Sequence, residues 1–346
     1  MQEVPDYVLP LERDAESREK IGCPICGSDN QVNLYEGVAL RGNDLILAMC
    51  MNCTHLFINP RPTLDAFKEF YQNDNYFELC ANFSKMSLEE KMAQFDDDAF
   101  WEERAGHARR LYEHHLKDVL SAEDTVFDFG CGDGGWLWGL RELTGCSVDG
   151  EEISDVYVDI VQKKLGQPIF AGPIEDTADD IVERYRGQVK VAIVSGSLQH
   201  MLDPMQCLRA ARDILTDDGL LYVCNWSIFE HFMASYEDQP RRLLGENLSW
   251  EHLHYFHETS FRYMVRRAGF EIVDFSLDSE VRAGHMEVVL RKTDVPAEPP
   301  TRDEVSAVVM RIDALERATL AGRLRGIGLD HKTYRSAAPL PRLSQD

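Results

Sequence analysis

A glycine-rich run after a buried strand is the part of this chain best suited to holding a nucleotide. Residues 126–135 read Val-Phe-Asp-Phe-Gly-Cys-Gly-Asp-Gly-Gly. The first four residues predict a buried parallel strand that carries one carboxylate, Asp128. Because a Cβ would block the close approach of a ligand, Gly130, Gly132 and Gly134 favour a loop whose backbone touches a ligand directly. The run also satisfies the dinucleotide pattern G-x-G-x-x-G, so the glycines alone leave the nucleotide open.

Four cysteines near the N-terminus have the spacing of a metal site. Cys23 and Cys26 form one C-x-x-C pair, and Cys50 and Cys53 form a second pair about two dozen residues later. Two such pairs can surround one tetrahedral Zn²⁺ and close its coordination shell, which predicts structural zinc. A redox C-x-x-C would need a thioredoxin-like βαβ context that is missing here. Metal binding would supply much of the folding energy of so small a module.

Histidines that could accept a proton cluster within residues 249–257, which read Ser-Trp-Glu-His-Leu-His-Tyr-Phe-His. Histidine is the natural base for a reaction near neutral pH, because its unperturbed pKa is about 6.5. His252 and His254 are two residues apart, so both would face one side of a strand. A structural role for His252, as a bridge between a lid and the core, is the alternative.

From about residue 121, strands and helices alternate. This rhythm predicts an α/β fold with a doubly wound, Rossmann-like sheet. The expected strands are 126–129, 147–151, 168–171, 189–195 and 220–225, with a closing antiparallel pair at 270–277 and 286–291. We divide the chain into a leader (1–20), a small zinc-binding β module (21–62), a helical cap (63–120), the Rossmann-like domain (121–293) with a lid insertion (227–260), and a linker with a C-terminal helix and tail (294–346).

Composition excludes several classes of partner. The formal net charge of −24 disfavours binding to nucleic acid or to anionic membranes, because both depend on a basic surface. No apolar run approaches the ~18 residues that cross a bilayer, and the first residues lack the order of a signal peptide. We therefore expect a cytoplasmic protein that binds neither nucleic acid nor a membrane. Pairing of a helix expected at 302–325 with a second copy, to form a homodimer, is left open.

Four motifs in a fixed order narrow the choice of nucleotide. They are Asp128-Phe-Gly-Cys-Gly-Asp-Gly, Gly150-Glu-Glu-Ile-Ser, Leu198-Gln-His-Met-Leu-Asp-Pro and Arg267-Ala-Gly-Phe-Glu-Ile-Val. Their order and spacing, from about residue 105 to 292, resemble those of class I S-adenosylmethionine-dependent methyltransferases. Each motif alone is weak, but the set is specific.

This resemblance implies a cofactor site for S-adenosylmethionine. Glu152 would accept both ribose hydroxyl groups, with Glu151 as the neighbouring candidate, and Asp128 would support the loop and the amino group of the cofactor. Many relatives have an acid directly after the glycine that follows the third strand, whereas this chain reads Gly-Pro-Ile-Glu there, so the adenine contact stays open between Ile174 and Glu175. The other implied cofactor residues are Tyr76, Gly130, Cys131, Gly132, Gly134, Ile153 and Ser195.

The segment Glu251-His-Leu-His-Tyr-Phe resembles zinc-containing deoxysugar C-methyltransferases and a wider set of sugar methyltransferases with the same zinc module. The resemblance implies that His252 is the general base, that Glu251 assists it, and that His254 and His200 are weaker candidates. Ser249 stands where the C-methylating enzymes have a tyrosine, so we expect O-methylation of a sugar, nucleotide-sugar or secondary-metabolite acceptor. C-methylation of a keto-deoxysugar through an enolate is the alternative, and a non-catalytic scaffold protein is a further one.

Overall fold

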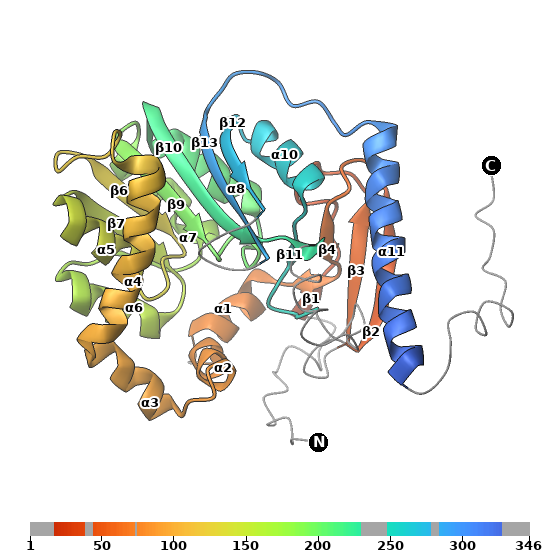
Figure 1. The fold of residues 1–346 in the computed structure, drawn as a ribbon, viewed down its shortest axis with the longest axis horizontal. Coiled ribbons are helices and arrows are strands. Elements are labelled where there is room, and N and C mark those ends of the chain that lie inside the picture. The colour runs from red at the N-terminus through yellow and green to blue at the C-terminus, as the bar shows by residue number, and fades with distance from the viewer. Residues whose placement is uncertain (1–16, 39–43, 73–74, 230–247, 278–283, 327–346) are drawn as a thin grey trace, which may run out of the picture.

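The computed structural model describes residues 17–38, 44–72, 75–229, 248–277 and 284–326. These residues form a large α/β part, a smaller β sheet built mainly from the N-terminal segment, and a long C-terminal helix (Figure 1). Most of the expected leader, residues 230–247 of the expected lid, and the expected tail from residue 327 lie outside the described residues.

A seven-stranded sheet forms the centre of the α/β part, in the order β12-β13-β10-β9-β6-β7-β8. Strands β6 to β10 are parallel, and β13 runs antiparallel to β10 and β12. The expected doubly wound sheet with its closing antiparallel pair is therefore confirmed. The strands are β6 (Thr125–Phe129), β7 (Ser147–Glu152), β8 (Phe170–Ala171), β9 (Val189–Ser195), β10 (Leu215–Trp226), β12 (Phe270–Ser276) and β13 (His285–Lys292).

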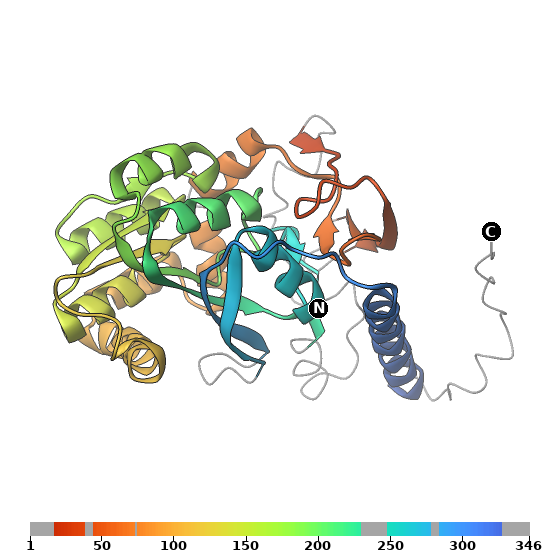
Figure 2. The same ribbon diagram turned by 90° about the horizontal axis from the view of Figure 1, so that it is seen from above.

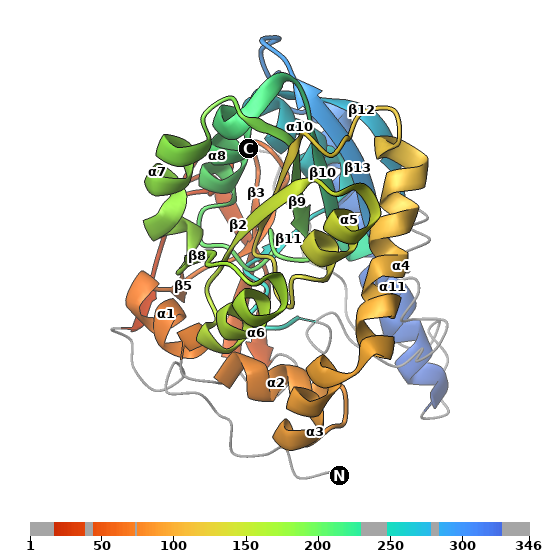
Figure 3. The same cartoon turned by 90° about the vertical axis from the view of Figure 1, so that its left-hand side faces the viewer.

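Helices cover both faces of this sheet (Figure 3). Because side chains alternate along a strand, Val126 packs against one helical layer and Phe127 against the other. The first layer comprises α4 (Asp98–Leu111), α5 (Gly135–Thr144) and α6 (Asp155–Leu165). The second comprises α7 (Ile174–Tyr185), α8 (Pro204–Ile214) and α10 (Glu258–Arg267).

A group of short helices connects the small sheet to α4. The sequence analysis expected a helical cap over 63–120 but did not predict α2 as a separate element. Aromatic side chains of this group, among them Phe70 and Tyr71, pack against Trp250. The elements are α1 (Leu64–Gln72), α2 (Asn75–Phe83), α3 (Leu88–Ala93) and the 3₁₀ turn η4 (Gln94–Asp96); the π turn η5 (Tyr112–Leu116) follows α4.

The small sheet takes one strand from far along the chain. Its order is β11-β4-β3-β2, with β2 (Gln31–Val38), β3 (Asp44–Cys50), β4 (Leu56–Ile58) and β11 (His254–Tyr255). Strand β11 pairs antiparallel with β4. Backbone N–H and C=O groups of β4 that would be unpaired at a sheet edge thereby form hydrogen bonds. Residues expected in a separate lid therefore belong in part to the N-terminal sheet. A two-residue pair, β1 (Arg18–Glu19) with β5 (Arg61–Pro62), lies beside it.

Helix α11 (Arg302–Gly326) lies against the small sheet (Figures 1 and 2). Val308 and Ile312 pack in one cluster with Leu45 and Leu47 of β3, so this helix buries an apolar face of the N-terminal sheet. Among the helices that the structure describes, none has the length and apolar character to cross a membrane.

Candidate active site

The glycine loop between β6 and α5 has three glycines in the left-handed region, with φ of 64° at Gly130, 55° at Gly132 and 74° at Gly134. A Cβ on Gly130 would lie 2.5 Å from Cβ of Ser197, and one on Gly134 would lie 2.9 Å from Val161. A Cβ on Gly132 would meet no atom within 4 Å. The first and third glycines are therefore required by packing, whereas Gly132 borders open space.

That space is a cavity of about 230 Å³ at the carboxyl ends of β6, β7 and β9, where α/β folds bind ligands. Two of the expected cofactor residues, Asp128 and Gly134, do not line it: Asp128 is buried within the sheet, and Gly134 is the N-cap residue of α5. The cavity brings together the other expected cofactor residues: Tyr76, Gly130, Cys131, Gly132, Glu152, Ile153, Ile174, Glu175 and Ser195.

Two consecutive glutamates at the end of β7 brace the glycine loop. The Glu152 carboxylate accepts hydrogen bonds from the backbone N–H of Gly132 and of Ser154, both at 2.8 Å. Glu151 accepts one from the N–H of Gly130 at 2.9 Å. Burial raises the pKa of both carboxyl groups. Each carboxylate oxygen keeps a second lone pair, so Glu152 can hold the loop and a ligand hydroxyl at once.

Two further buried carboxyl groups have a free oxygen. Asp128 is 1% exposed, and its Oδ1 has no hydrogen-bond partner in the part of the chain that the structure describes. Glu175 accepts from the N–H of Asp203 through Oε1 at 2.8 Å, and its Oε2 has no partner among the described residues. Burial raises the pKa of both groups. Such oxygens are costly to bury alone. Glu175 lines the cavity, so its free oxygen suits a ligand that carries a hydrogen-bond donor.

His200 is the expected catalytic candidate that lines the cavity. Its Nδ1 lies 2.8 Å from the backbone oxygen of Glu251 and 3.1 Å from the Tyr71 hydroxyl. Burial lowers the pKa of His200, and the Glu251 carboxylate opposes that shift in part. The imidazole is therefore neutral near pH 7.

His252 and Glu251 lie next to His200 and not in the cavity wall. The His252 ring centroid is 4.7 Å from that of His200 and 4.7 Å from that of Trp226, both edge-to-face. Glu251 is 3% exposed, and its carboxylate accepts the Ser249 hydroxyl. The two residues thus stand behind the histidine that faces the cavity.

His254 lies in β11 with both ring nitrogens engaged. Its Nδ1 is 3.0 Å from Nε2 of His55, and its Nε2 donates to the backbone oxygen of Met201 at 2.8 Å. Burial lowers its pKa to about 3. The expectation that His252 and His254 share one strand face is wrong, because β11 begins only at His254 and His252 precedes it in a turn.

Residues that sequence reasoning did not select also line the cavity, notably Arg104, His107 and Tyr157. Arg104 pairs with Asp133 of the glycine loop at 2.9 Å, and its Nε has no partner among the described residues. A Cβ on Gly135 would lie 2.7 Å from Cβ of Arg104, so that glycine lets α4 approach the loop. The i, i+3 spacing of Arg104 and His107 on a predicted helix was the available signal.

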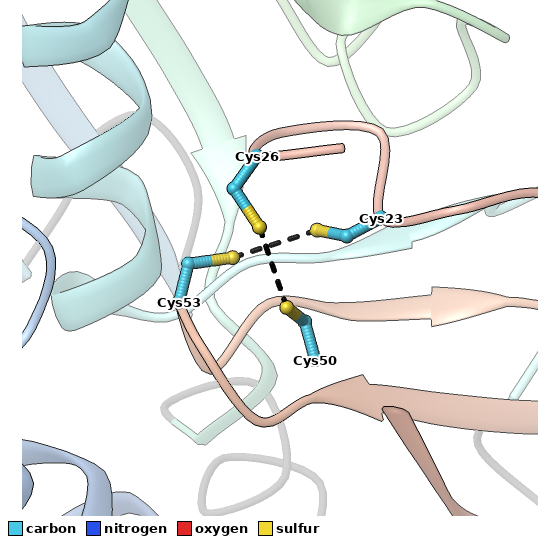
Figure 4. Close-up of side chains that lie close together, drawn as sticks. All are labelled: Cys23, Cys26, Cys50 and Cys53. Carbon is cyan, nitrogen blue, oxygen red and sulfur yellow. Dashed lines mark hydrogen bonds between the residues drawn. The ribbon is translucent and has the colours of Figure 1, made fainter. Parts of the chain in front are cut away.

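The four cysteines of the N-terminal pairs converge on one point (Figure 4). Their sulfur atoms all lie within 4.8 Å of one another, with 3.5 Å between Cys23 and Cys53 and between Cys26 and Cys50. Sulfurs around a tetrahedral Zn²⁺ with bonds of about 2.3 Å would be about 3.8 Å apart. The pKa of the Cys53 thiol is raised by its hydrogen bonds with Cys23 and Cys50. A cation would therefore be needed to hold all four cysteines as thiolates.

The sequence profile of a methyltransferase domain matches residues 100–274, about half of the chain. The chain belongs to this methyltransferase family. The motif order and the fold make it a class I S-adenosylmethionine-dependent enzyme, and the matched residues hold the glycine loop, both glutamates and His200. No curated protein matches the sequence.

Solved methyltransferases resemble this one at low identity. The CcbJ methyltransferase from Streptomyces caelestis is 17% identical, covers 55% of this chain and 90% of its own, and gives a TM-score of 0.40. The geranyl diphosphate C-methyltransferase from Streptomyces coelicolor A3(2) is 12% identical over 57% of this chain and 83% of its own, with a TM-score of 0.40. A putative type 11 methyltransferase from Sulfolobus solfataricus is 16% identical over 54% and 94%, with a TM-score of 0.38.

Proposed function

We propose that this methyltransferase methylates a hydroxyl group of a small-molecule acceptor and that His200 removes the hydroxyl proton. The hydrogen bond between Nδ1 of His200 and the backbone oxygen of Glu251 carries this assignment. A carbonyl oxygen can only accept, so Nδ1 bears the proton of the neutral ring. Nε2 then keeps its lone pair, as a general base requires. Burial lowers the pKa of His200 and holds this form at neutral pH.

His252 and Glu251 then support His200 and do not act on the acceptor themselves. The His252 ring packs edge-to-face on that of His200 and limits its rotation. The backbone of Glu251 orients the imidazole, and its carboxylate favours the imidazolium that forms when the proton is taken up. This assignment replaces His252 by His200 as the base.

The residues that line the cavity have the chemistry to hold S-adenosylmethionine, which supplies a methyl group on a positively charged sulfur. Gly132 leaves room beside the loop for the methionine part. Glu152 would accept the ribose hydroxyl groups, and the free Oε2 of Glu175 would accept from the adenine amino group. Asp128 would balance the positive charge of the amino group from within the sheet. Arg104 is the one lysine or arginine among the described lining residues, so we assign it to the carboxylate.

The four-cysteine cluster would hold Zn²⁺ with a structural role. Four sulfurs complete the tetrahedral shell and leave no position for a substrate. Cys23, Cys50 and Cys53 belong to the same apolar cluster as residues of the large sheet, so metal binding would stabilise the contact between the two parts.

For the acceptor we propose a sugar, a nucleotide-sugar or a related secondary metabolite. This choice rests on the resemblance of residues 251–256 and of the zinc module to sugar methyltransferases. Methylation of carbon next to a ketone is the second candidate, and one observation favours it. Tyr71 places a phenol 3.1 Å from Nδ1 of His200, which offers a tyrosine near the base although Ser249 replaces the one that the C-methylating enzymes carry.

Mass spectrometry with labelled cofactor and a panel of sugars, nucleotide-sugars and phenols would identify the acceptor. His200→Gln removes the basic nitrogen and keeps a polar side chain of similar length, so we expect kcat to fall by about 10²- to 10⁴-fold. The affinity for S-adenosylhomocysteine should stay within a factor of about two. His252→Gln is the matched control and should lower kcat far less. If His252→Gln lowered kcat more than His200→Gln, His252 would be the base.

The methylated product found by mass spectrometry also shows whether oxygen or carbon was methylated. An O-methylated product has lost one exchangeable hydroxyl proton, whereas a C-methylated product keeps all of them. Exchange of a carbon-bound hydrogen of the acceptor with D₂O, in the presence of enzyme, would indicate the enolate route.

A further inference from the structure

The imidazole of His254 lies where the small sheet meets the chain segment that carries His200. His254 belongs to β11, which pairs with β4 (Figure 1), and it is 2% exposed. Its Nε2 lies 2.8 Å from the backbone oxygen of Met201, directly after His200, and its Nδ1 lies 3.0 Å from Nε2 of His55. Neither His254 nor His55 lines the cofactor cavity. The proposed reaction therefore gives neither ring a direct part.

Hydrogen-bond chemistry fixes the tautomer of His254. The carbonyl oxygen of Met201 can only accept, so Nε2 of His254 bears a proton. Burial lowers the pKa of His254 to about 3, so the ring is neutral at pH 7 and its Nδ1 keeps a lone pair. His55 must then donate its Nε2–H to that lone pair. The hydrogen bonds run in one direction, from His55 through His254 to Met201.

The chain on both sides of His200 is held by His254. On one side, the backbone oxygen of Gln199 accepts the backbone N–H of His254 at 3.1 Å and that of Leu253 at 2.8 Å. On the other side, the backbone oxygen of Met201 accepts the imidazole N–H of His254. His200 stands between these two contacts, so the direction of its side chain depends on the position of His254.

His55 occupies an apolar site at a cost. Its ring stacks on that of Phe57, with centroids 5.8 Å apart and 4° between the planes, and lies 5.3 Å from the ring of Phe256. Its Nδ1 is buried without a hydrogen-bond partner among the described residues, which is unfavourable for a polar atom. A phenylalanine would fill the same space without that unsatisfied nitrogen. What a histidine adds here is the N–H that it donates to His254.

We propose that His254, oriented by the N–H of His55, positions His200 for removal of the acceptor proton. This inference rests on the proposed function, because His254 acts only through the base. A base must lie within hydrogen-bond reach of the proton that it takes, and a displacement of about 1 Å can lower the rate about 10²-fold. His254 and His55 are therefore positioning residues, since neither lines the cavity.

Two substitutions of His254 separate its two side-chain contacts. Glutamine places its amide near the position of Nε2, so His254→Gln keeps a donor for Met201. Asparagine reaches only as far as Nδ1, so His254→Asn keeps an acceptor for His55 and loses that donor. We expect kcat to fall about 10- to 100-fold in His254→Asn and to stay close to the wild-type value in His254→Gln. The affinity for S-adenosylhomocysteine, measured by calorimetric titration, should be unchanged in both.

His257→Asn is the matched control. His257 is a second buried histidine of the same segment, and its Nε2 donates to the backbone oxygen of Thr54 at 2.9 Å and not to a residue of 199–201. Asparagine also suits its place as the N-cap of α10. We expect His257→Asn and His254→Asn to have a similar loss of Tm and the zinc content of wild type. Only His254→Asn should lose kcat.

His55→Phe removes the N–H donor and keeps a ring of similar size. It should lower kcat by a smaller factor than His254→Asn. In the His254→Asn background it should lower kcat no further, because the contact with Met201 is already lost. In ¹H–¹⁵N spectra of histidine-labelled wild type at pH 7, His254 should carry its proton on Nε2. Its signal is assigned by its absence from His254→Gln.

Five results would overturn the proposal: an unchanged kcat in His254→Asn, an equal loss of kcat in His254→Gln, an equal loss in His257→Asn, an unchanged kcat in His55→Phe, or a proton on Nδ1 of His254. If His254→Asn does not fold, His55→Phe and the spectrum of wild type still decide. An unchanged kcat in His200→Gln would instead refute the proposed function. If His200→Gln lowers kcat and His254→Asn does not, His200 remains the base and only the role of His254 is refuted.

Discussion

Gly132→Ala tests whether the glycine loop holds the cofactor. Gly132 has a φ of 55° and lines the cavity, and a Cβ added there meets no protein atom within 4 Å. The variant therefore fits the folded protein, and the new methyl group occupies space that a ligand would use. Substitutions at Gly130 or Gly134 are less informative, because their Cβ atoms would collide with Ser197 or Val161.

The expected magnitudes separate stability from binding. An alanine in the left-handed region costs about 1 kcal/mol, which lowers the Tm of a chain of this size by a few degrees. Crowding a fitted site by one methyl group costs about 1–3 kcal/mol, which weakens cofactor binding about 5- to 150-fold. Gly166→Ala is the matched control: its φ is 69°, its Cβ also meets nothing within 4 Å, and it ends α6 away from the cavity.

The assay combines thermal unfolding with calorimetric titration of S-adenosylhomocysteine. Both variants should show the same small loss of Tm, and only Gly132→Ala should lose affinity. If Gly132→Ala binds as tightly as Gly166→Ala, the cofactor does not occupy this cavity beside the loop. If both variants lose affinity equally, the effect is one of stability and the reasoning also fails.

Four further outcomes follow from the same geometry. Arg104→Gln should weaken S-adenosylhomocysteine about 10- to 100-fold by loss of a charge-assisted contact, but leave methylthioadenosine, which lacks the carboxylate, unaffected in the same titration. Burial raises the pKa of Asp128 in the folded state, so ionisation of Asp128 lowers the stability of the folded protein as the pH rises above about 3.8. In the absence of cofactor, Asp128→Asn should therefore have a higher Tm than wild type at pH 8 but not at pH 4. The same variant should bind S-adenosylhomocysteine more weakly. Because burial lowers the pKa of His200, the acid limb of kcat against pH should have its midpoint below 6.5. Cys53→Ser should lower the zinc content measured by elemental analysis, the Tm and kcat.

The fold was largely predictable because its signals are local. The expected strands 126–129 and 189–195 coincide with β6 and β9. Helix α2 was not predicted as a separate element because its nine residues, Asn75–Phe83, are few for a periodic pattern, although Asn75, Glu78 and Asn82 share one polar face. The pairing of β11 with β4 was not predicted either, because strands of two and three residues that lie about two hundred residues apart show no periodic pattern in the sequence.

The residues of the candidate site also differ in whether local sequence signals predict them. Residues of the glycine loop and Glu152 are neighbours through one strand–loop–helix unit, so their spacing in sequence reveals them. The choice of base among the histidines depends instead on which ring faces the cavity. That is decided by long-range contacts, since the hydrogen bond of His200 joins residues 51 positions apart.

The strand that sequence alone could not place connects the four-cysteine module to His200, the base that we propose. Gln199, directly before His200, accepts the backbone N–H groups of Leu253 and His254 at 2.8 and 3.1 Å, and the His254 ring donates to Met201, directly after it. Strand β11 is held in turn by β4, which follows the last cysteine pair. By contrast, Glu152 and the glycine loop are joined to each other by hydrogen bonds at the end of the large sheet, with a further ion pair from Arg104 of α4 to Asp133. Loss of the metal should therefore displace His200 before it disturbs the cofactor site, so Cys53→Ser should lower kcat by a larger factor than it lowers the affinity for S-adenosylhomocysteine.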